Sequence, residues 1–214
     1  MTQNAISVLL VDDHEVVRAG YHRLLESNPG ISVVAQATTG DEACQLYQQC
    51  HPDVVVMDLT MPGISGLEAS RRILARDAAA RILVFSVHEN EVMLGRALDM
   101  GIKGYISKRS ASRVMIEAVR QVAAGEIYIG QEMMSFLVRH KASSDSDSVA
   151  GLSTREFEVF QLLVDSKSVN EIAELLSLSP KTVGHHVAHI KTKLGISSIA
   201  DMTRLAIRLG IISP

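Results

Sequence analysis

Few cysteines and no long apolar run limit what this chain can be. No apolar stretch approaches the roughly 20 residues that a membrane-spanning helix requires, and Asp12 and Asp13 stand where a signal peptide would still be apolar. We therefore expect a cytosolic protein with no membrane partner. The two cysteines, Cys44 and Cys50, fall in one predicted helix without the spacing of metal ligands, so we expect reduced, structural thiols.

The chain also lacks the basic excess typical of proteins that bind nucleic acid through charge. Its formal net charge is −3. The charge is uneven, because residues 151–214 carry 7 Lys and Arg against 6 Asp and Glu, whereas the segments 1–124 and 125–150 are both acidic. A nucleic-acid-binding surface is therefore to be sought in the last third of the chain.

The chain does have enough apolar sequence for two domains. It has 214 residues, 47% of them hydrophobic, and a domain usually takes about 100–200 residues. Short β-branched runs alternate with amphipathic stretches in residues 1–124, and the predicted strands are 6–11, 31–37, 54–57, 81–85 and 102–106. Strands that alternate with helices indicate right-handed βαβ units, so the first predicted domain is a doubly wound α/β domain with a five-stranded parallel sheet.

The composition changes after this domain. Residues 125–150 end in a tract of Ser, Asp and Ala with almost nothing to bury, which predicts a linker preceded by a short helix over 131–140. Residues 151–214 predict a second, smaller all-α domain. Its first helix starts at a capping box of Ser153 and Glu156, and the other helices cover 168–176, 180–194 and 198–209.

Polar side chains stand at the carboxyl ends of four predicted strands. Asp12 and Asp13 follow the first strand, Asp58 the third, Ser86 the fourth and Lys108 the fifth. These ends converge in a doubly wound sheet, and three neighbouring carboxylates repel one another unless a cation is present, which predicts a Mg²⁺ site. Asp58 stands alone on the central strand and is the predicted nucleophile towards a phosphoryl group. Lys108 would offset the charge of the transferring oxygens, and Ser86 would hydrogen-bond the product phosphate.

Three motifs of this first domain resemble the receiver domains of bacterial response regulators. They are Leu10-Val11-Asp12-Asp13-His14, Met57-Asp58-Leu59-Thr60-Met61-Pro62-Gly63 and Gly104-Tyr105-Ile106-Ser107-Lys108, in the expected order over the first 120 or so residues. The resemblance implies the flavodoxin-like strand order and phosphoryl transfer to Asp58 from the phosphohistidine of a sensor histidine kinase.

The same resemblance implies the metal ligands and a switch. The Mg²⁺ ligands would be Asp13, Asp58, the backbone carbonyl of Thr60 and, through water, Asp12. In the switch, Ser86 would move towards the phosphate and Tyr105 would turn inward behind it. Two residues depart from the family pattern, Arg109 directly after Lys108 and His88 two positions after Ser86, and both make the lifetime of the phosphate unpredictable.

Two helices of the second domain have the spacing of a helix-turn-helix, because only residues 177–179 separate them. Apolar side chains form a seam between the two helices: Ile172, Ala173, Leu176, Val183, Val187, Ile190 and Leu194. The opposite face of the second helix carries the predicted DNA-binding residues Lys181, Thr182, His185, His186, His189 and Lys191, together with Lys193. Lys and Thr near a helix N-terminus suit phosphate contacts, and a helix in the major groove can present imidazoles to base edges. A solvated helix face is the alternative.

Four motifs favour the DNA-binding interpretation because they resemble the LuxR-type domain of NarL/FixJ-family regulators. They are Leu152-Ser153-Thr154-Arg155-Glu156, Asn170-Glu171-Ile172-Ala173, Ser179-Pro180-Lys181-Thr182-Val183 and Lys193-Leu194-Gly195-Ile196. The resemblance implies a promoter-binding transcriptional regulator, dimeric on phosphorylation or DNA binding, with residues 199–209 at the DNA-bound dimer contact. Gly184 and Ala188 stand where the family often has lysines, so base preference does not carry over.

Two other functions stay open beside this non-enzymatic regulator. One is a Mg²⁺-dependent phosphatase that works through the same aspartyl phosphate. Such enzymes typically carry a second carboxylate two positions after the nucleophile, and Thr60 occupies that position here, which argues against turnover. The other is a DNA-binding regulator that ignores phosphorylation.

Overall fold

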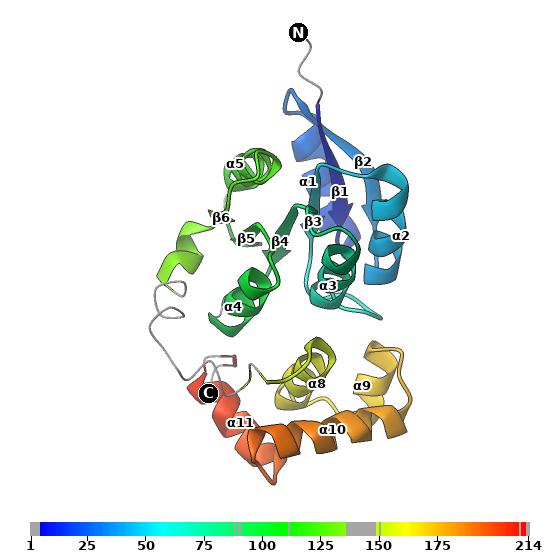
Figure 1. The fold of residues 1–214 in the computed structure, drawn as a ribbon, viewed down its shortest axis with the longest axis vertical. Coiled ribbons are helices and arrows are strands. Elements are labelled where there is room, and N and C mark those ends of the chain that lie inside the picture. The colour runs from blue at the N-terminus through cyan, green and yellow to red at the C-terminus, as the bar shows by residue number, and fades with distance from the viewer. Residues whose placement is uncertain are drawn as a thin grey trace. The chain divides into compact units, whose positions relative to one another are not determined.

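A computed structural model describes residues 5–87, 89, 91–110, 112–135, 149, 151–209 and 211–212. The chain forms two compact units, an α/β unit of residues 1–89 and 97–134 built on a parallel sheet, and an all-helical unit of residues 90–96 and 135–214 (Figure 1). The predicted fold class is thereby confirmed. Within the described residues, every helix is too short or too polar to span a bilayer.

The α/β unit is centred on a six-stranded parallel sheet. The strands are β1 (Ile6–Val11), β2 (Ile31–Ala37), β3 (Val54–Met57), β4 (Ile82–Ser86), β5 (Gly104–Ser107) and β6 (Tyr128–Ile129), in the spatial order β2-β1-β3-β4-β5-β6. The first five strands have the flavodoxin-like order. The four residues of β3 are all apolar and buried, as expected of a central strand that is covered on both faces.

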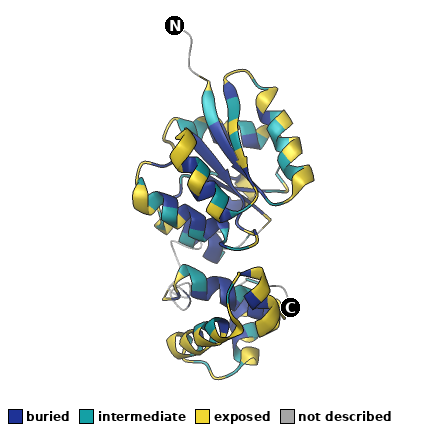
Figure 2. Ribbon diagram, turned by 90° about the vertical axis from the view of Figure 1, so that its right-hand side faces the viewer, coloured by how far each residue is buried: buried dark blue, intermediate teal, exposed yellow. Residues whose placement is uncertain are grey.

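Helices cover both faces of this sheet. These helices are α1 (Glu15–Glu26), α2 (Gly40–Cys50), α3 (Gly66–Arg76) and α5 (Ser112–Ala123). Helix α4 (Glu91–Asp99) is divided between the two units at Arg96. Alternate residues of β1, β3 and β4 pack with α1 and α5 in one core, which includes Leu10, Val56 and Phe85. Helices α2 and α3 pack against each other, and α3 lies on the face opposite to α1 (Figure 1). Figure 2 shows the strands as the buried centre of the unit.

The structure corrects the strand predictions in two places. The predicted strand 81–85 begins and ends one residue before β4, so Ser86 is the last residue of β4 and does not follow it. The predicted strand 102–106 begins two residues before β5. The second correction is β6, which lies in the predicted linker and pairs Tyr128 with Gly104. A two-residue strand is too short to show a periodic pattern, so the sequence contains no signal for it.

Of the short helix predicted over 131–140, the structure describes residues 131–135, which form a 3-10 turn followed by helical residues at Met134 and Ser135. This turn, η1 (Gln131–Met133), follows β6, and the side chain of Met133 is fully buried. Residues 136–140, and the serine-rich tract that ends the predicted linker, lie outside the described residues.

The helical unit contains α8 (Thr154–Val164), α9 (Val169–Leu175), α10 (Pro180–Leu194) and α11 (Ile199–Arg208). The capping box of Ser153 and Glu156 is confirmed, and α9 and α11 begin with similar boxes. Gly195 ends α10 in the left-handed conformation with φ 64°. Most of the predicted seam is buried, including Ile172, Val183 and Ile190, whereas Val187 and Leu194 are half-buried.

Candidate functional site

The carboxyl ends of β1, β3 and β5 bring a lysine and two aspartates together. Asp58 directly follows β3, is almost completely buried, and donates its backbone N–H to the carbonyl of Val11 in β1. Lys108 Nζ donates a hydrogen bond of 2.7 Å to Asp58 Oδ2 and also lies 2.7 Å from Asp12 Oδ2. One ammonium group therefore bridges two carboxylates from different strands.

The charged groups of this pocket shift one another's pKa. Burial raises the pKa of Asp58, and Lys108 offsets part of that rise. Burial lowers the pKa of Lys108, but the hydrogen bonds and charges of Asp12 and Asp58 outweigh it, so the pKa of Lys108 is raised overall. Lys108 is therefore a cation at neutral pH, placed directly beside the carboxylate of Asp58.

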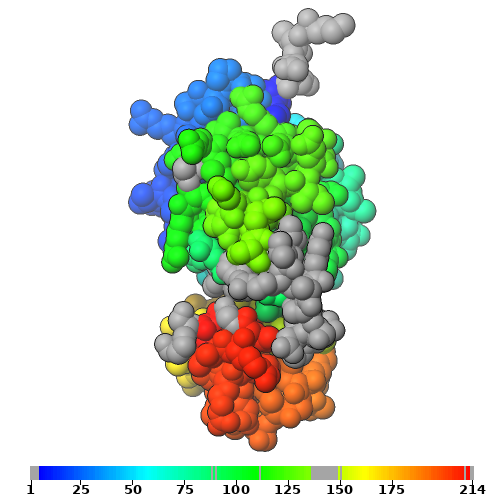
Figure 3. All heavy atoms as spheres, turned by 90° about the vertical axis from the view of Figure 1, so that its left-hand side faces the viewer, coloured from blue at the N-terminus to red at the C-terminus, as the bar shows by residue number. Residues whose placement is uncertain are grey.

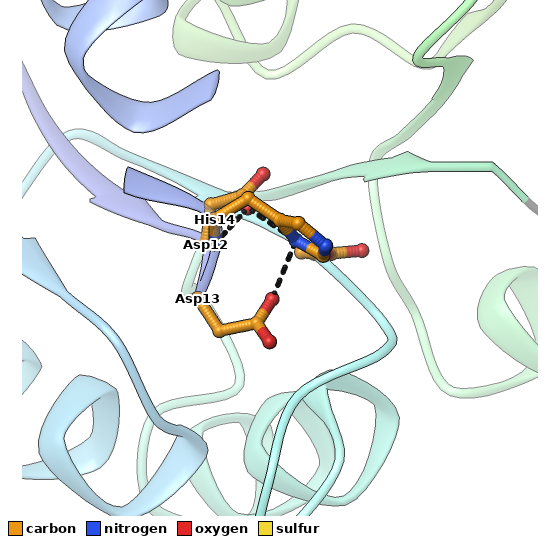
Figure 4. Close-up of side chains that lie close together, drawn as sticks. Asp12, Asp13 and His14 are labelled. Atoms are coloured by element: carbon orange, nitrogen blue, oxygen red, sulfur yellow. Dashed lines mark hydrogen bonds and ion pairs between the residues drawn. The ribbon is translucent and has the colours of Figure 1, made fainter. Parts of the chain in front are cut away.

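Four side chains around this pocket can offer ligands to a metal ion. One potential ligand atom from each of Asp12, Asp13, His14 and Asp58 lies within 4.8 Å of the others, and Figure 4 shows the carboxylates of Asp12 and Asp13 beside the ring of His14. Asp13 Oδ1 is shielded from solvent and accepts no hydrogen bond from the described residues, although His14 Nδ1 lies 2.8 Å away. An acidic pocket with such an oxygen fits a hard cation such as Mg²⁺.

The other predicted receiver residues lie around Asp58. The backbone N–H of Thr60 donates to Asp58 Oδ1 at 3.3 Å. Ser86 and Tyr105 are completely buried, and a hydrogen bond joins their side chains. Burial raises the pKa of Tyr105, so its hydroxyl stays protonated. The ring of Tyr105 therefore already occupies an inward position.

Sequence reasoning missed Gly66, the first residue of α3. A Cβ atom at this position would lie 1.7 Å from the carbonyl oxygen of Asp58, so only glycine lets α3 approach the loop that begins at Asp58. The backbone N–H of Gly66 also donates to the carbonyl of Leu59. A single sequence contains no signal for such a close approach, because it depends on two segments meeting in space.

Two glutamates hold the loop that carries Lys108, and neither was predicted. Glu132 Oε1 accepts a hydrogen bond of 3.2 Å from the backbone N–H of Ser107, and Glu89 accepts one from the hydroxyl of the same serine. Arg109, one of the departures from the family pattern, lies 3.6 Å from Glu89. The other departure, His88, lies outside the described residues.

The predicted DNA-binding face of α10 is partly exposed (Figure 2). Atoms of α10 and α11 form part of the surface seen in Figure 3. Lys181, His185 and His189 are exposed. Since a helix turns about 100° per residue, His185 and His189 point away from the buried seam, whereas His186 and Lys191 lie on opposite flanks. Thr182, His186 and Lys191 are half-buried.

Part of this face is occupied by contacts with α8. Lys193 Nζ donates a hydrogen bond of 2.6 Å to Glu156 Oε2, and His189 Nδ1 lies 3.7 Å from Glu156 Oε1. Lys193 therefore anchors α10 to the start of α8. Burial and the charge of Arg155 lower the pKa of His186, so His186 is neutral near pH 7.

Comparison with known proteins defines the class of this chain. Residues 8–120 match the family model of the response regulator receiver domain, and residues 150–206 match the model of bacterial regulatory proteins of the luxR family. The response regulator UvrY of Escherichia coli K12 is 38% identical over 208 residues, covering 96% of this chain and 95% of UvrY. GacA of Pseudomonas protegens is 38% identical, covering 97% and 98% of the two chains.

The chain therefore belongs to the response regulators, and within them to the NarL/FixJ family, in which a receiver domain is joined to a LuxR-type DNA-binding domain. Solved structures agree with this assignment. The response regulator ChrA of a heme-sensing two-component system is 31% identical with a TM-score of 0.54, covering 98% of this chain and 100% of ChrA. Salmonella enterica RcsB bound to promoter DNA is 25% identical with a TM-score of 0.68, covering 94% and 98%.

Proposed function

We propose that Asp58 is the phosphoacceptor of this response regulator and takes its phosphoryl group from a sensor histidine kinase. The observation that carries the proposal is the contact of Lys108 Nζ with both Asp58 and Asp12 at 2.7 Å. A buried carboxylate beside a fixed cation and further carboxylates is the arrangement that covalent aspartyl phosphorylation requires.

Mg²⁺ is the proposed cofactor, held by Asp13, Asp58, the backbone carbonyl of Thr60 and, through water, Asp12. The support is the oxygen-rich cluster and the buried Asp13 Oδ1. When bound, the ion would neutralise charge on the phosphoryl oxygens.

Asp58, Lys108 and Ser86 would have different roles in the phosphoryl transfer. A carboxylate oxygen of Asp58 attacks phosphorus, the bond from phosphorus to the kinase histidine nitrogen breaks, and its electron pair stays on that nitrogen. The Lys108 ammonium pairs with a phosphoryl oxygen in place of its present contact with Asp58. The Ser86 hydroxyl donates its proton to the new phosphate, so that it can only accept in its hydrogen bond with Tyr105.

The helical unit is the proposed reader of promoter DNA, through Lys181, Thr182, His185, His186, His189 and Lys191 on α10. RcsB, a structural neighbour, was solved on promoter DNA in the presence of the phosphomimetic BeF₃⁻. We propose by analogy that phosphorylation promotes a homodimer and that α11 forms the DNA-bound dimer contact. The proposed domain bounds are 1–124 for the receiver, 125–150 for the linker and 151–214 for the DNA-binding domain. A cytosolic location stays a prediction.

Labelling with a small phosphoryl donor tests the phosphoacceptor. The full chain with Mg²⁺ and acetyl phosphate is expected to gain one phosphoryl group by intact mass, and Asp58→Asn is expected to lose it. Asp41→Asn is the matched control, because Asp41 is exposed on α2 and forms an ion pair with Arg72 at the surface. Equal labelling of Asp58→Asn and wild type would assign the phosphate to another residue.

The same labelling, together with a DNA-binding measurement, separates the regulator from the two alternative functions. The family regulates transcription, which favours a role other than catalysis. Stable stoichiometric labelling supports the regulator, whereas continuous release of phosphate over many turnovers would identify a phosphatase. If wild type and Asp58→Asn, both treated with donor, bind promoter DNA equally well, the regulator ignores phosphorylation.

A further inference from the structure

We propose that His185 and His189 form a binding site for a divalent late transition metal ion on the exposed face of α10. The two imidazoles would supply nitrogen ligands, and water would complete the coordination. The site is separate from the proposed Mg²⁺ pocket of the receiver. Its expected effect on DNA binding rests on the proposed function of α10, whereas metal binding itself does not.

The helix places the two imidazoles within reach of one ion. His185 and His189 are four residues apart in the continuous helix α10 (Pro180–Leu194) and both are exposed. Side chains at this spacing are neighbours on one helix face, with Cβ atoms about 5–6 Å apart. Two histidines at the same spacing hold zinc in the helical H-E-x-x-H motif, so the geometry is sufficient for two bonds to one metal.

A buried carboxylate supports one of the two ligands. Glu156 Oε1 lies 3.7 Å from the Nδ1 atom of His189, and Lys193 and Ser153 hold the same carboxylate in place. Histidines that bind metals usually direct their second ring nitrogen to a carboxylate or carbonyl, which orients the ring. A small rotation of the His189 ring would close this contact and present Nε2 to the ion.

The available ligands indicate which ions fit. Among the described residues, the groups of three or more potential ligands are confined to the aspartate pocket of the receiver, so this site has two protein ligands and open positions. Imidazole nitrogen suits Zn²⁺, Ni²⁺ and Cu²⁺, and affinity is expected to be highest for Cu²⁺. Mg²⁺ prefers oxygen ligands and would not compete.

Metal binding on this face would be coupled to DNA binding. His185 and His189 point away from the seam that joins α10 to α9, and this is the face proposed to meet base edges. An ion with its water ligands would occupy the space that the imidazoles need to approach DNA. Metal and DNA would then weaken each other's binding by the same factor.

The first test measures the metal alone, on the full chain with excess Mg²⁺ present. Cu²⁺ is the probe. Electron paramagnetic resonance detects its nitrogen ligands, and titration gives the number of sites. Wild type is expected to bind one Cu²⁺ more than His185→Asn and His189→Asn do, with the signal of two imidazole ligands that both variants lack. Any Cu²⁺ held by the cluster of Asp12, Asp13, His14 and Asp58 is expected to remain in all three proteins. The matched control is His22→Asn, a change on α1 in the α/β unit. If both α10 variants bind Cu²⁺ as wild type does, the site does not exist.

The second test measures DNA affinity by fluorescence anisotropy, first without added metal. Binding of wild type under these conditions tests the proposed DNA-binding function by itself. Cu²⁺ is then expected to weaken DNA binding by wild type and by His22→Asn. The DNA affinity of His185→Asn is expected to be the same with and without Cu²⁺. If Cu²⁺ binds through His185 and His189 but DNA affinity does not change, the coupling is refuted and the metal site stands.

Discussion

The receiver pocket and the exposed face of α10 achieve their chemistry in opposite ways. The pocket collects Asp12, Asp58 and Lys108 from three separate strand ends and buries the two carboxylates almost completely. The α10 face takes its polar side chains from one helix, and the two histidines opposite the seam, His185 and His189, are exposed. The first site depends on contacts across the sheet, and the second depends mainly on helix periodicity.

This difference has an energetic consequence. Charges in a buried pocket interact strongly, and adding a single atom to a packed backbone forces neighbouring segments to move. An exposed helix face tolerates substitution, because solvent screens its charges and leaves room for new side chains. Substitutions of glycine and of charged residues should therefore change stability more in the pocket than on the helix face.

The largest effect is expected from Gly66→Ala. The new Cβ would lie 1.7 Å from the carbonyl oxygen of Asp58, so α3 or the loop that begins at Asp58 must shift. We expect the free energy of unfolding of the receiver to fall by about 3 kcal/mol and labelling of Asp58 to be lost. Urea denaturation and intact mass measure the two effects.

Gly20→Ala is the matched control for this substitution. Gly20 lies within α1, and a Cβ there would meet no atom within 4 Å. Alanine has the higher helix propensity, so we expect stabilisation by about 0.5–1 kcal/mol with unchanged labelling. Equal destabilisation by both substitutions would contradict the role assigned to Gly66.

A smaller loss is expected from Glu156→Gln in the helical unit. This change removes the ionic partner of Lys193 and weakens the capping box of α8, and we expect a cost of about 2 kcal/mol. Hydrogen exchange of the α8 and α10 amides measures it. Unchanged protection in both helices would show that Lys193 does not anchor α10.

The same residue predicts a pH dependence. Burial raises the pKa of Glu156, but Lys193 and Ser153 outweigh burial and lower the pKa overall. A carboxyl whose pKa is lower in the folded state stabilises the fold above its unfolded pKa of about 4.3, and this contribution is lost as the pH falls through the folded pKa. Protection of α8 should therefore fall on acidification below about pH 4.3, and less steeply in Glu156→Gln.

Mg²⁺ is expected to stabilise the receiver by a moderate amount. At ten times its dissociation constant, an ion that binds only the folded state adds about 1.4 kcal/mol. Asp13→Asn should abolish the increase in melting temperature that Mg²⁺ causes, and Asp41→Asn on α2 should keep it. An equal increase in both variants would place the ion outside the aspartate cluster.

The smallest effect is expected from Gly184 on α10. A Cβ at Gly184 would meet no atom within 4 Å, so Gly184→Ala should stabilise the helical unit by about 0.5–1 kcal/mol. Gly184→Lys should add one phosphate contact and steepen the dependence of log K on log salt by about 0.9. An unchanged salt dependence would place this position away from the DNA backbone.

Local patterns in the sequence determined most of the fold. The bounds of β1, β2 and β3 agree with the predicted ranges, because runs of β-branched residues between polar loops are local signals. The Ser153 and Glu156 capping box and the end of α10 at Gly195 were likewise predicted, since caps involve residues a few positions apart. The βαβ pattern predicted a doubly wound parallel sheet, whose converging strand ends implied that Asp58 and Lys108 would meet, and the resemblance to receiver domains implied the strand order.

Tertiary structure alone decided the features that join distant segments. Pairing of β6 with β5, the close approach of Gly66 to Asp58, and the hydrogen bond of Lys193 to Glu156 each connect residues more than five positions apart. No periodicity or cap marks such contacts, because the partner is selected by packing in three dimensions. The sequence by itself thus determined the elements and the chemistry at their ends, and the folded chain decided the backbone approaches and ion pairs that hold those elements in place.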